Sequence, residues 1–149
     1  MIRAAKLSVR HAYWGALPLR ELLIDGRTIQ DLVAKHTQRR SAMLDSCVSP
    51  LGWLDSADAQ VSLARFLPDG PADFSAGHRA ILVCRECGSF GCGALSIRIT
   101  AEGGNVIWSD WLWQVDYDDD SQHDHFENKV PKLAFELEDY LSVLRNAVR

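Results

Sequence analysis

The sequence lacks the short motifs that mark the commonest catalytic sites. It contains no Gly-x-Ser-x-Gly, no His-Glu-x-x-His, no Gly-Lys-Ser, and no Gly-x-Gly-x-x-Gly after a strand-like segment. These motifs belong to nucleophile turns, zinc hydrolases, phosphate-binding loops and dinucleotide-binding folds. Without them, no reaction can be assigned from a motif, and nothing in the sequence shows which of the 20 acidic side chains share a cleft.

Two further absences concern the partners of the chain. No apolar run approaches the roughly 20 residues of a membrane helix, and the N-terminal segment has no apolar leader. Basic residues are not in excess, because 16 Lys and Arg stand against 20 Asp and Glu, a net charge of -4. Negative charge repels nucleic-acid phosphates and anionic lipids. We therefore expect a cytoplasmic protein that binds neither nucleic acid nor membrane.

The length and composition suit one domain with its own core. The chain has 149 residues, of which 47% are hydrophobic, and it shows no repeat and no linker over residues 1–149. Short alternating segments after residue 79 predict a meander of antiparallel strands. Capped or periodic segments predict three helices, at 28–36, 56–67 and 137–147. The expected fold is α+β with a mainly antiparallel sheet.

Three of the four cysteines, Cys84, Cys87 and Cys92, lie in a segment expected to turn between two strands. Cys-x-x-Cys followed by Gly is a common turn in which two thiolates face one zinc ion. Cys92 can supply a third sulfur, so the segment predicts a zinc site. The fourth ligand stays open, and the candidates are Cys47, His78, His123 and His125.

Other interpretations of these cysteines stay open. They can be inert side chains at a hairpin end, with the glycines required by the sharp turn. They can also be a reactive thiol pair, although such a pair needs cationic neighbours, and here Glu86 offsets Arg85. An iron–sulfur cluster is disfavoured, because the Cys-x2-Cys-x4-Cys spacing reverses the plant-type ferredoxin order and lacks a clear fourth thiolate.

An acidic segment follows the last expected strand. Residues 116–127 place Asp or Glu at positions 1, 3, 5, 9 and 12 of a calcium loop. The sixth position is Ser121, where the turn normally needs glycine, and the preceding segment is strand-like rather than helical. We interpret the segment as a solvated acidic loop, with calcium binding left open. Its Asp118, Asp119 and Asp120 would attract a basic surface.

Tryptophans are concentrated in one expected strand, where Trp108, Trp111 and Trp113 fall within six positions. A regular strand would place Trp108 on one face and the other two on the opposite face, so without a bulge at least one ring lies away from the core. Exposed rings would mark a binding surface. Alternatively, other elements cover both faces of the sheet and bury the rings.

The cysteine segment and the tryptophan strand together carry a resemblance. The pattern Cys84-x-Glu86-Cys87-Gly88-x-x-Gly91-Cys92-Gly93-Ala94 is followed by Trp108-x-Asp110-Trp111-x-Trp113 and by Phe135-x4-Tyr140. In these residues the chain resembles a family of small uncharacterised bacterial proteins that share a Cys-x-x-Cys-Gly-x-x-Gly-Cys-Gly-Ala hairpin. The resemblance covers the C-terminal half well and the N-terminal half loosely. It implies a bacterial origin and one compact domain, and it implies no catalytic residue.

The sequence favours a protein-binding module of the immunity or accessory kind, because catalytic motifs are missing and the chain is small and acidic. The expected partner is a protein with a basic surface. The expected contact residues are Trp108, Trp111, Trp113, Asp118, Asp119 and Asp120. The alternative is a metal- or thiol-dependent enzyme that uses Cys84, Cys87 and Cys92.

Overall fold

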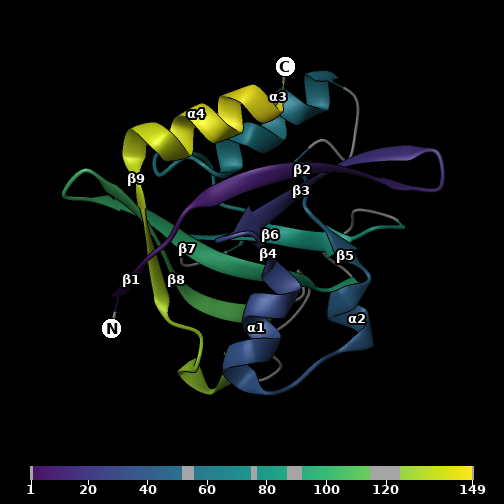
Figure 1. Ribbon diagram of the computed structural model, residues 1–149, viewed down its shortest axis with the longest axis horizontal. Coiled ribbons are helices and arrows are strands. Elements are labelled where there is room, and N and C mark those ends of the chain that lie inside the picture. Colours follow the sequence, from purple (N-terminus) through teal and green to yellow (C-terminus); the bar gives the residue numbers. More distant parts are fainter. Residues whose placement is uncertain (1, 52–55, 75–76, 87–91, 115–124, 149) are drawn as a thin grey trace.

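A computed structural model gives the conformation of residues 2–51, 56–74, 77–86, 92–114 and 125–148. Within these residues the chain forms an α+β fold with two sheets (Figure 1). The strands are β1 (Ile2–Ala4), β2 (Leu7–Trp14), β3 (Leu17–Ile24), β4 (Arg27–Thr28), β5 (Cys47–Val48), β6 (His78–Cys84), β7 (Ala94–Glu102), β8 (Asn105–Gln114) and β9 (Lys132–Glu136). The helices are α1 (Ile29–Thr37), α2 (Ala42–Asp45), α3 (Ser56–Arg65) and α4 (Leu137–Ala147), and a short 3-10 helix, η4, covers Phe126–Asn128.

The larger sheet has six strands in the order β1-β9-β8-β7-β6-β5, and the smaller has the order β2-β3-β4. The predicted meander is confirmed, since β6 pairs with β7 and β7 with β8, both antiparallel. One pairing is parallel: β1 runs alongside β9, which joins the two ends of the described chain. No pattern in the sequence indicates this pair, because a strand of three residues shows little alternation.

The three predicted helices are confirmed to within two residues at each end. Helix α1 begins where expected because the Thr28 hydroxyl accepts a hydrogen bond from the Asp31 amide at 3.1 Å. It ends at Gln38, whose φ of 57° takes the chain out of the helix. The four-residue helix α2 was not predicted; the Ser41 hydroxyl caps it by accepting from the Leu44 amide.

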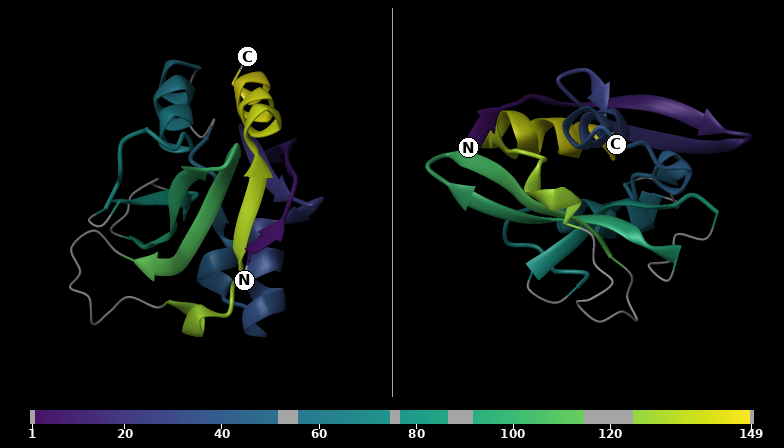
Figure 2. Two further views of the ribbon diagram at one scale, coloured as in Figure 1. Left: turned by 90° about the vertical axis from the view of Figure 1, so that its left-hand side faces the viewer. Right: turned by 90° about the horizontal axis from the view of Figure 1, so that it is seen from below.

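The hydrophobic core lies between the two sheets and unites them into one body. The sheets face each other, with α3 and α4 together at one end and α1 at the other (Figure 2). Buried residues from both sheets and from α1 and α4 form one cluster. Among its largest members are Leu22, Ile29, Ile97, Trp108 and Tyr140. Burial of these side chains supplies the main driving force for folding.

A second, smaller cluster lies on the outer face of the six-stranded sheet. It consists of Ala80, Val83 and Ala94, against which Val48 and Phe74 pack. The segment around Phe74 therefore covers part of that face. Further along β7, Arg98 and Thr100 are exposed, so the same face becomes open to solvent there. A group of polar side chains that includes His78 and Asp110 lies at this transition.

Candidate functional site

A β-bulge in β8 places one carboxylate at the outer face of the sheet. Arg98 pairs with Ser109 and Ser96 with Leu112, so Asp110 and Trp111 both lie opposite a single residue of β7. Asp110 has a φ of 56°, a left-handed conformation that aspartate adopts more readily than most residues. A bulge of this kind redirects a side chain out of the regular alternation. Here it separates the Asp110 carboxylate from the Trp111 ring, which is buried.

The Asp110 carboxylate lies between two imidazoles. Nε2 of His78 is 3.0 Å from Oδ2 of Asp110 and 3.2 Å from its main-chain oxygen. A proton on that nitrogen is therefore donated to both oxygens. On the other side, Nδ1 of His125 is 3.6 Å from Oδ1, which is an ion-pair distance and slightly longer than a hydrogen bond. The three side chains form a His–Asp–His cluster.

The two histidines occupy different surroundings. The His78 side chain is only 5% exposed, whereas that of His125 is 48% exposed. The buried His78 ring therefore holds the Asp110 carboxylate in place from the protein side. Because His125 turns Nδ1 toward Asp110, its other ring nitrogen is the one left for a ligand. An imidazole oriented by a carboxylate in this way can accept or deliver a proton at Nε2.

His125 and Asp110 border a cavity of about 470 Å³, which we call the bulge pocket. Its walls are Arg98 and Ser109 of the sheet, Asp110 and Trp111 of the bulge, and the residues His125 and 128–132 of the segment that leads into β9. Among the described residues of its lining, Arg98, Lys129 and Lys132 carry cationic side chains and Asp110 carries a carboxylate. The described part of the lining is therefore positive, whereas the whole chain has a net charge of -4.

Strained backbone is concentrated around the same pocket. Of the five non-glycine residues with positive φ in the described chain, Asp110, Phe126 and Asn128 lie in the bulge or in η4. Such conformations cost about 1–3 kcal/mol each and persist where the surrounding structure imposes them, often at functional sites. The bulge and η4, which both border the pocket, are therefore held in these conformations by the surrounding structure.

The tryptophan strand is packed inward rather than outward. Trp108 and Trp111 are 0% and 3% exposed, and their rings meet edge-to-face with centroids 6.0 Å apart. The bulge between them allows both rings to reach the core, which a regular strand would not. Trp113 is half-buried against the same core. Neither Trp108 nor Trp111 is thus available as an exposed contact, which corrects the expectation that these two rings form a binding surface.

The cysteines are partly brought together. Cys47 pairs with Cys84 across β5 and β6, while Cys92 is exposed just before β7. His78 and Cys84 form opposite ends of β6, roughly 20 Å apart at the rise of a strand. His78 bonds to Asp110 and His125 lies beside it, so neither histidine adjoins the cysteine segment. Of the described candidates for a fourth ligand, only Cys47 does.

Three of the predicted features lie outside the described residues. They are Cys87, His123 and the acidic residues Asp118, Asp119 and Asp120. The zinc, calcium and acidic-surface interpretations that depend on them stay predictions. In the part of the chain that the structure describes, no group of three His, Cys, Asp or Glu side chains is placed to hold a metal ion.

The His–Asp–His cluster is not among the sites that the sequence predicts. In the sequence, His78 and His125 are candidate zinc ligands, and Asp110 belongs to a tryptophan pattern. The available signal was weak: an aspartate interrupts the apolar residues of a strand, as happens at bulges. No sequence pattern links Asp110 to His78, 32 residues before it, or to His125, 15 residues after it.

No protein-family model, curated protein or solved structure matches the chain. Among the described residues, no helix is long and apolar enough to cross a membrane. The site therefore has to be interpreted from its own geometry.

Proposed function

We propose that the bulge pocket binds a small ligand carrying an oxyanion, a phosphate or a carboxylate, and that His125 exchanges a proton with it. The observation that carries this proposal is the Asp110 carboxylate, which joins a buried and an exposed imidazole at the edge of a cavity. A histidine held by a carboxylate is a common acid–base device. Asp110 is then a positioning residue and His125 the residue that contacts the ligand.

The charges of the pocket support an anionic ligand. Arg98 of β7, Lys129 just after η4, and Lys132 of β9 all line one cavity. Guanidinium and ammonium groups donate charge-assisted hydrogen bonds to phosphate or carboxylate oxygens. The Ser109 hydroxyl and the Asn128 side chain in the same lining add neutral donors. A ligand of the size of a sugar phosphate or a small organic acid would suit a cavity of about 470 Å³.

The proposal can be tested by titrating the full chain with inorganic phosphate and with acetate as probes. We expect saturable binding by calorimetry and chemical-shift changes at His125, and an observed binding heat that differs between buffers of different ionisation enthalpy, which reports proton uptake. His125→Asn should abolish the proton uptake and weaken binding about tenfold, the loss of one charge-assisted bond. Asp110→Asn, which tolerates the same backbone, should reduce the proton uptake more than the affinity.

His11→Asn is the matched control, because His11 is exposed on β2 in the other sheet. It should leave both affinity and proton uptake unchanged. Binding that is equally strong in the His125→Asn and His11→Asn variants would place the anion elsewhere and refute the role of the bulge pocket.

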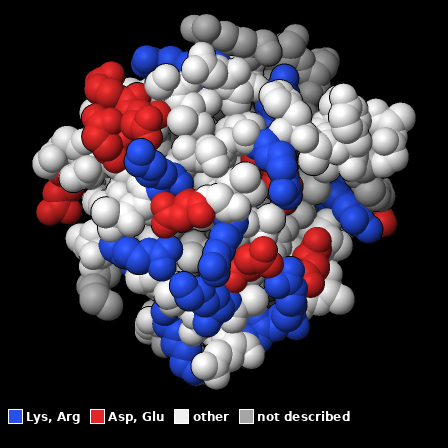
Figure 3. Space-filling view, viewed as in Figure 1, with Lys and Arg blue, Asp and Glu red and all other residues white. Residues whose placement is uncertain are grey.

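A second proposal, binding to another protein, is favoured by a different observation. The far end of the β2–β3 hairpin projects beyond the rest of the molecule in Figure 1 and in the right-hand view of Figure 2, and Tyr13 near its tip is 75% exposed. Exposed tyrosines are common anchors of protein interfaces. Charge is also unevenly spread: on the face in Figure 3, acidic side chains gather beside the start of α4 and basic ones around α1.

This second proposal keeps the immunity- or accessory-like role, and it moves the contact from the buried tryptophans to the hairpin. Tyr13→Ala should speed dissociation from a partner purified from the host, whereas Met43→Ala, at another exposed apolar residue, should not. Equal dissociation rates in the two variants would exclude the hairpin as the contact. A zinc ion at Cys84, Cys87 and Cys92 and a cytoplasmic location stay predictions.

A further inference from the structure

Two cysteines far apart in the sequence face each other across neighbouring strands. Cys47 of β5 and Cys84 of β6 are direct partners in an antiparallel pair, followed by the pair Val48 and Val83. Residues directly opposite each other project to the same face of a sheet, and successive pairs alternate between faces. Val48 and Val83 belong to the outer cluster, whereas Cys47 belongs to the main core. Both sulfurs therefore lie on the core-facing side.

This register brings the two residues within disulfide range. Opposed residues of antiparallel strands have Cα atoms about 4.5 or 5.5 Å apart. Disulfides join residues whose Cα atoms are about 4.4–6.8 Å apart. Linking Cys47 to Cys84 thus requires side-chain rotation rather than movement of the strands. In this structure both residues are thiols.

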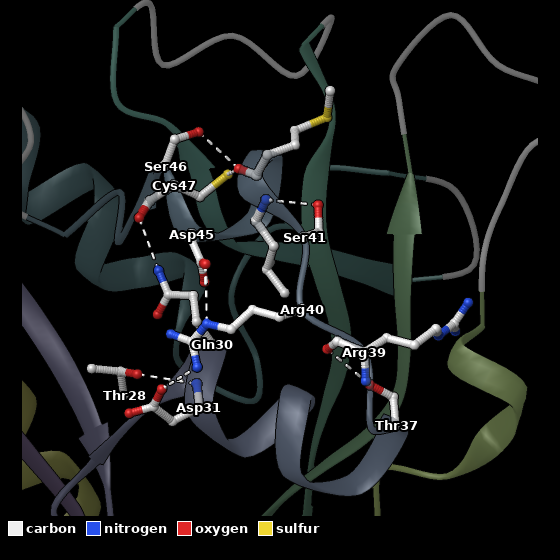
Figure 4. A network of polar contacts seen from close by, with 12 residues as sticks. Thr28, Gln30, Asp31, Thr37, Arg39, Arg40, Ser41, Asp45, Ser46 and Cys47 are labelled. Atoms are coloured by element: carbon white, nitrogen blue, oxygen red, sulfur yellow. Dashed lines mark hydrogen bonds and ion pairs between the residues drawn. The ribbon is translucent and has the colours of Figure 1, made fainter.

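The surroundings of Cys47 favour an uncharged sulfur. Its thiol donates a hydrogen bond to the Met43 carbonyl oxygen at 3.3 Å, and its own carbonyl accepts one from Gln30 Nε2 at 3.0 Å (Figure 4). Cys47 is buried, and a disulfide carries no charge to desolvate there.

We propose that Cys47 and Cys84 are an oxidation site, at which a small-molecule disulfide of the glutathione type converts the two thiols into a disulfide in the folded chain. Cys84, which is only half-buried, loses its proton and attacks the external disulfide, forming a mixed disulfide and releasing one small thiol. Cys47 then loses its proton and attacks the Cys84 sulfur, releasing the second small thiol. Two protein thiols are oxidised, and one external disulfide is reduced to two thiols. The site is independent of the bulge pocket.

The experiment is oxidation of the folded wild-type chain with oxidised glutathione, followed by alkylation, intact-mass measurement and peptide mapping. We expect the oxidised chain to take up alkyl groups on two of its four cysteines, where the reduced chain takes up four, and we expect a Cys47–Cys84 peptide. The melting temperature should rise by roughly 10 °C, because the bond closes a long loop in the unfolded chain. The Cys87→Ser, Cys92→Ser double variant retains only the proposed pair and should give the same product. In urea the preference for this pair should disappear.

The control variants are Cys47→Ser and Cys84→Ser, each of which should show no rise in melting temperature on oxidation. Two outcomes would overturn the proposal. One is a dominant Cys84–Cys92 or Cys84–Cys87 product in the folded wild-type chain. The other is a double variant that carries glutathione on Cys84 while Cys47 stays a thiol.

Discussion

Gly93 is a single residue that decides how closely the cysteine segment approaches the tryptophan strand. Its φ is 95°, and a Cβ built there would lie 2.3 Å from Cζ2 of Trp113. An alanine would meet both a backbone conformation that L-residues disfavour and a rigid ring. We expect Gly93→Ala to lower the free energy of unfolding by about 3 kcal/mol, measured by urea denaturation, from overpacking plus backbone strain.

Gly103→Ala separates these two causes. Gly103 also has a positive φ, 59°, but a Cβ there meets no heavy atom within 4 Å. The expected loss is about 1 kcal/mol, from backbone strain alone. If both variants lose the same free energy of unfolding, the Trp113 ring moves aside at little cost, and the close approach at Gly93 does not contribute to stability.

At the scale of elements, local chemistry allowed most of the fold to be predicted. The Thr28 cap of α1, the periodicity of α3 and α4, and the alternation of β2, β3, β6 and β7 act within a few residues, so the sequence displays them directly. The β1–β9 pair has no such signal, because its two strands come from opposite ends of the chain, and among the described strands the three-residue β1 pairs with β9 alone. The two-residue strand β5 is a similar case, since its described partner β6 lies about 30 residues further along the chain.

The candidate site depends on an element that the sequence leaves ambiguous. The alternation of apolar residues in β8 shows a strand, but it does not show which residue is extra at a bulge. Only with Asp110 as the extra residue do Trp108 and Trp111 share the core face while the carboxylate meets His78. For the cysteine segment, the sequence predicts the turn itself but not the residue that lies opposite Cys84. That residue is Cys47, because the order of the strands places β5 beside β6.

At the scale of the whole molecule, buried polar groups join elements that the sequence separates widely. The Tyr140 hydroxyl of α4 donates to the main-chain oxygen of Phe66, just beyond α3, at 2.6 Å. It accepts from Nε1 of Trp108 in β8 at 3.2 Å. The Arg79 guanidinium of β6 donates to four main-chain oxygens at the end of α3, those of Arg65, Leu67, Pro68 and Gly70. Helix α3 is thereby held against both α4 and the sheet.

Tyr140→Phe tests this connection with almost no change in volume. The variant leaves a buried indole N–H and a buried carbonyl oxygen without the hydroxyl, and unsatisfied buried groups cost about 1–3 kcal/mol each. We expect a loss of about 2 kcal/mol in the free energy of unfolding, measured by urea denaturation. Relative to the wild-type chain, amide exchange should speed up more in α3 than in β8. Tyr13→Phe is the control: its residue is 75% exposed, and the change should be within about 0.5 kcal/mol. Equal stabilities for the two variants, or unchanged exchange in α3, would show that apolar packing alone holds α3 in place.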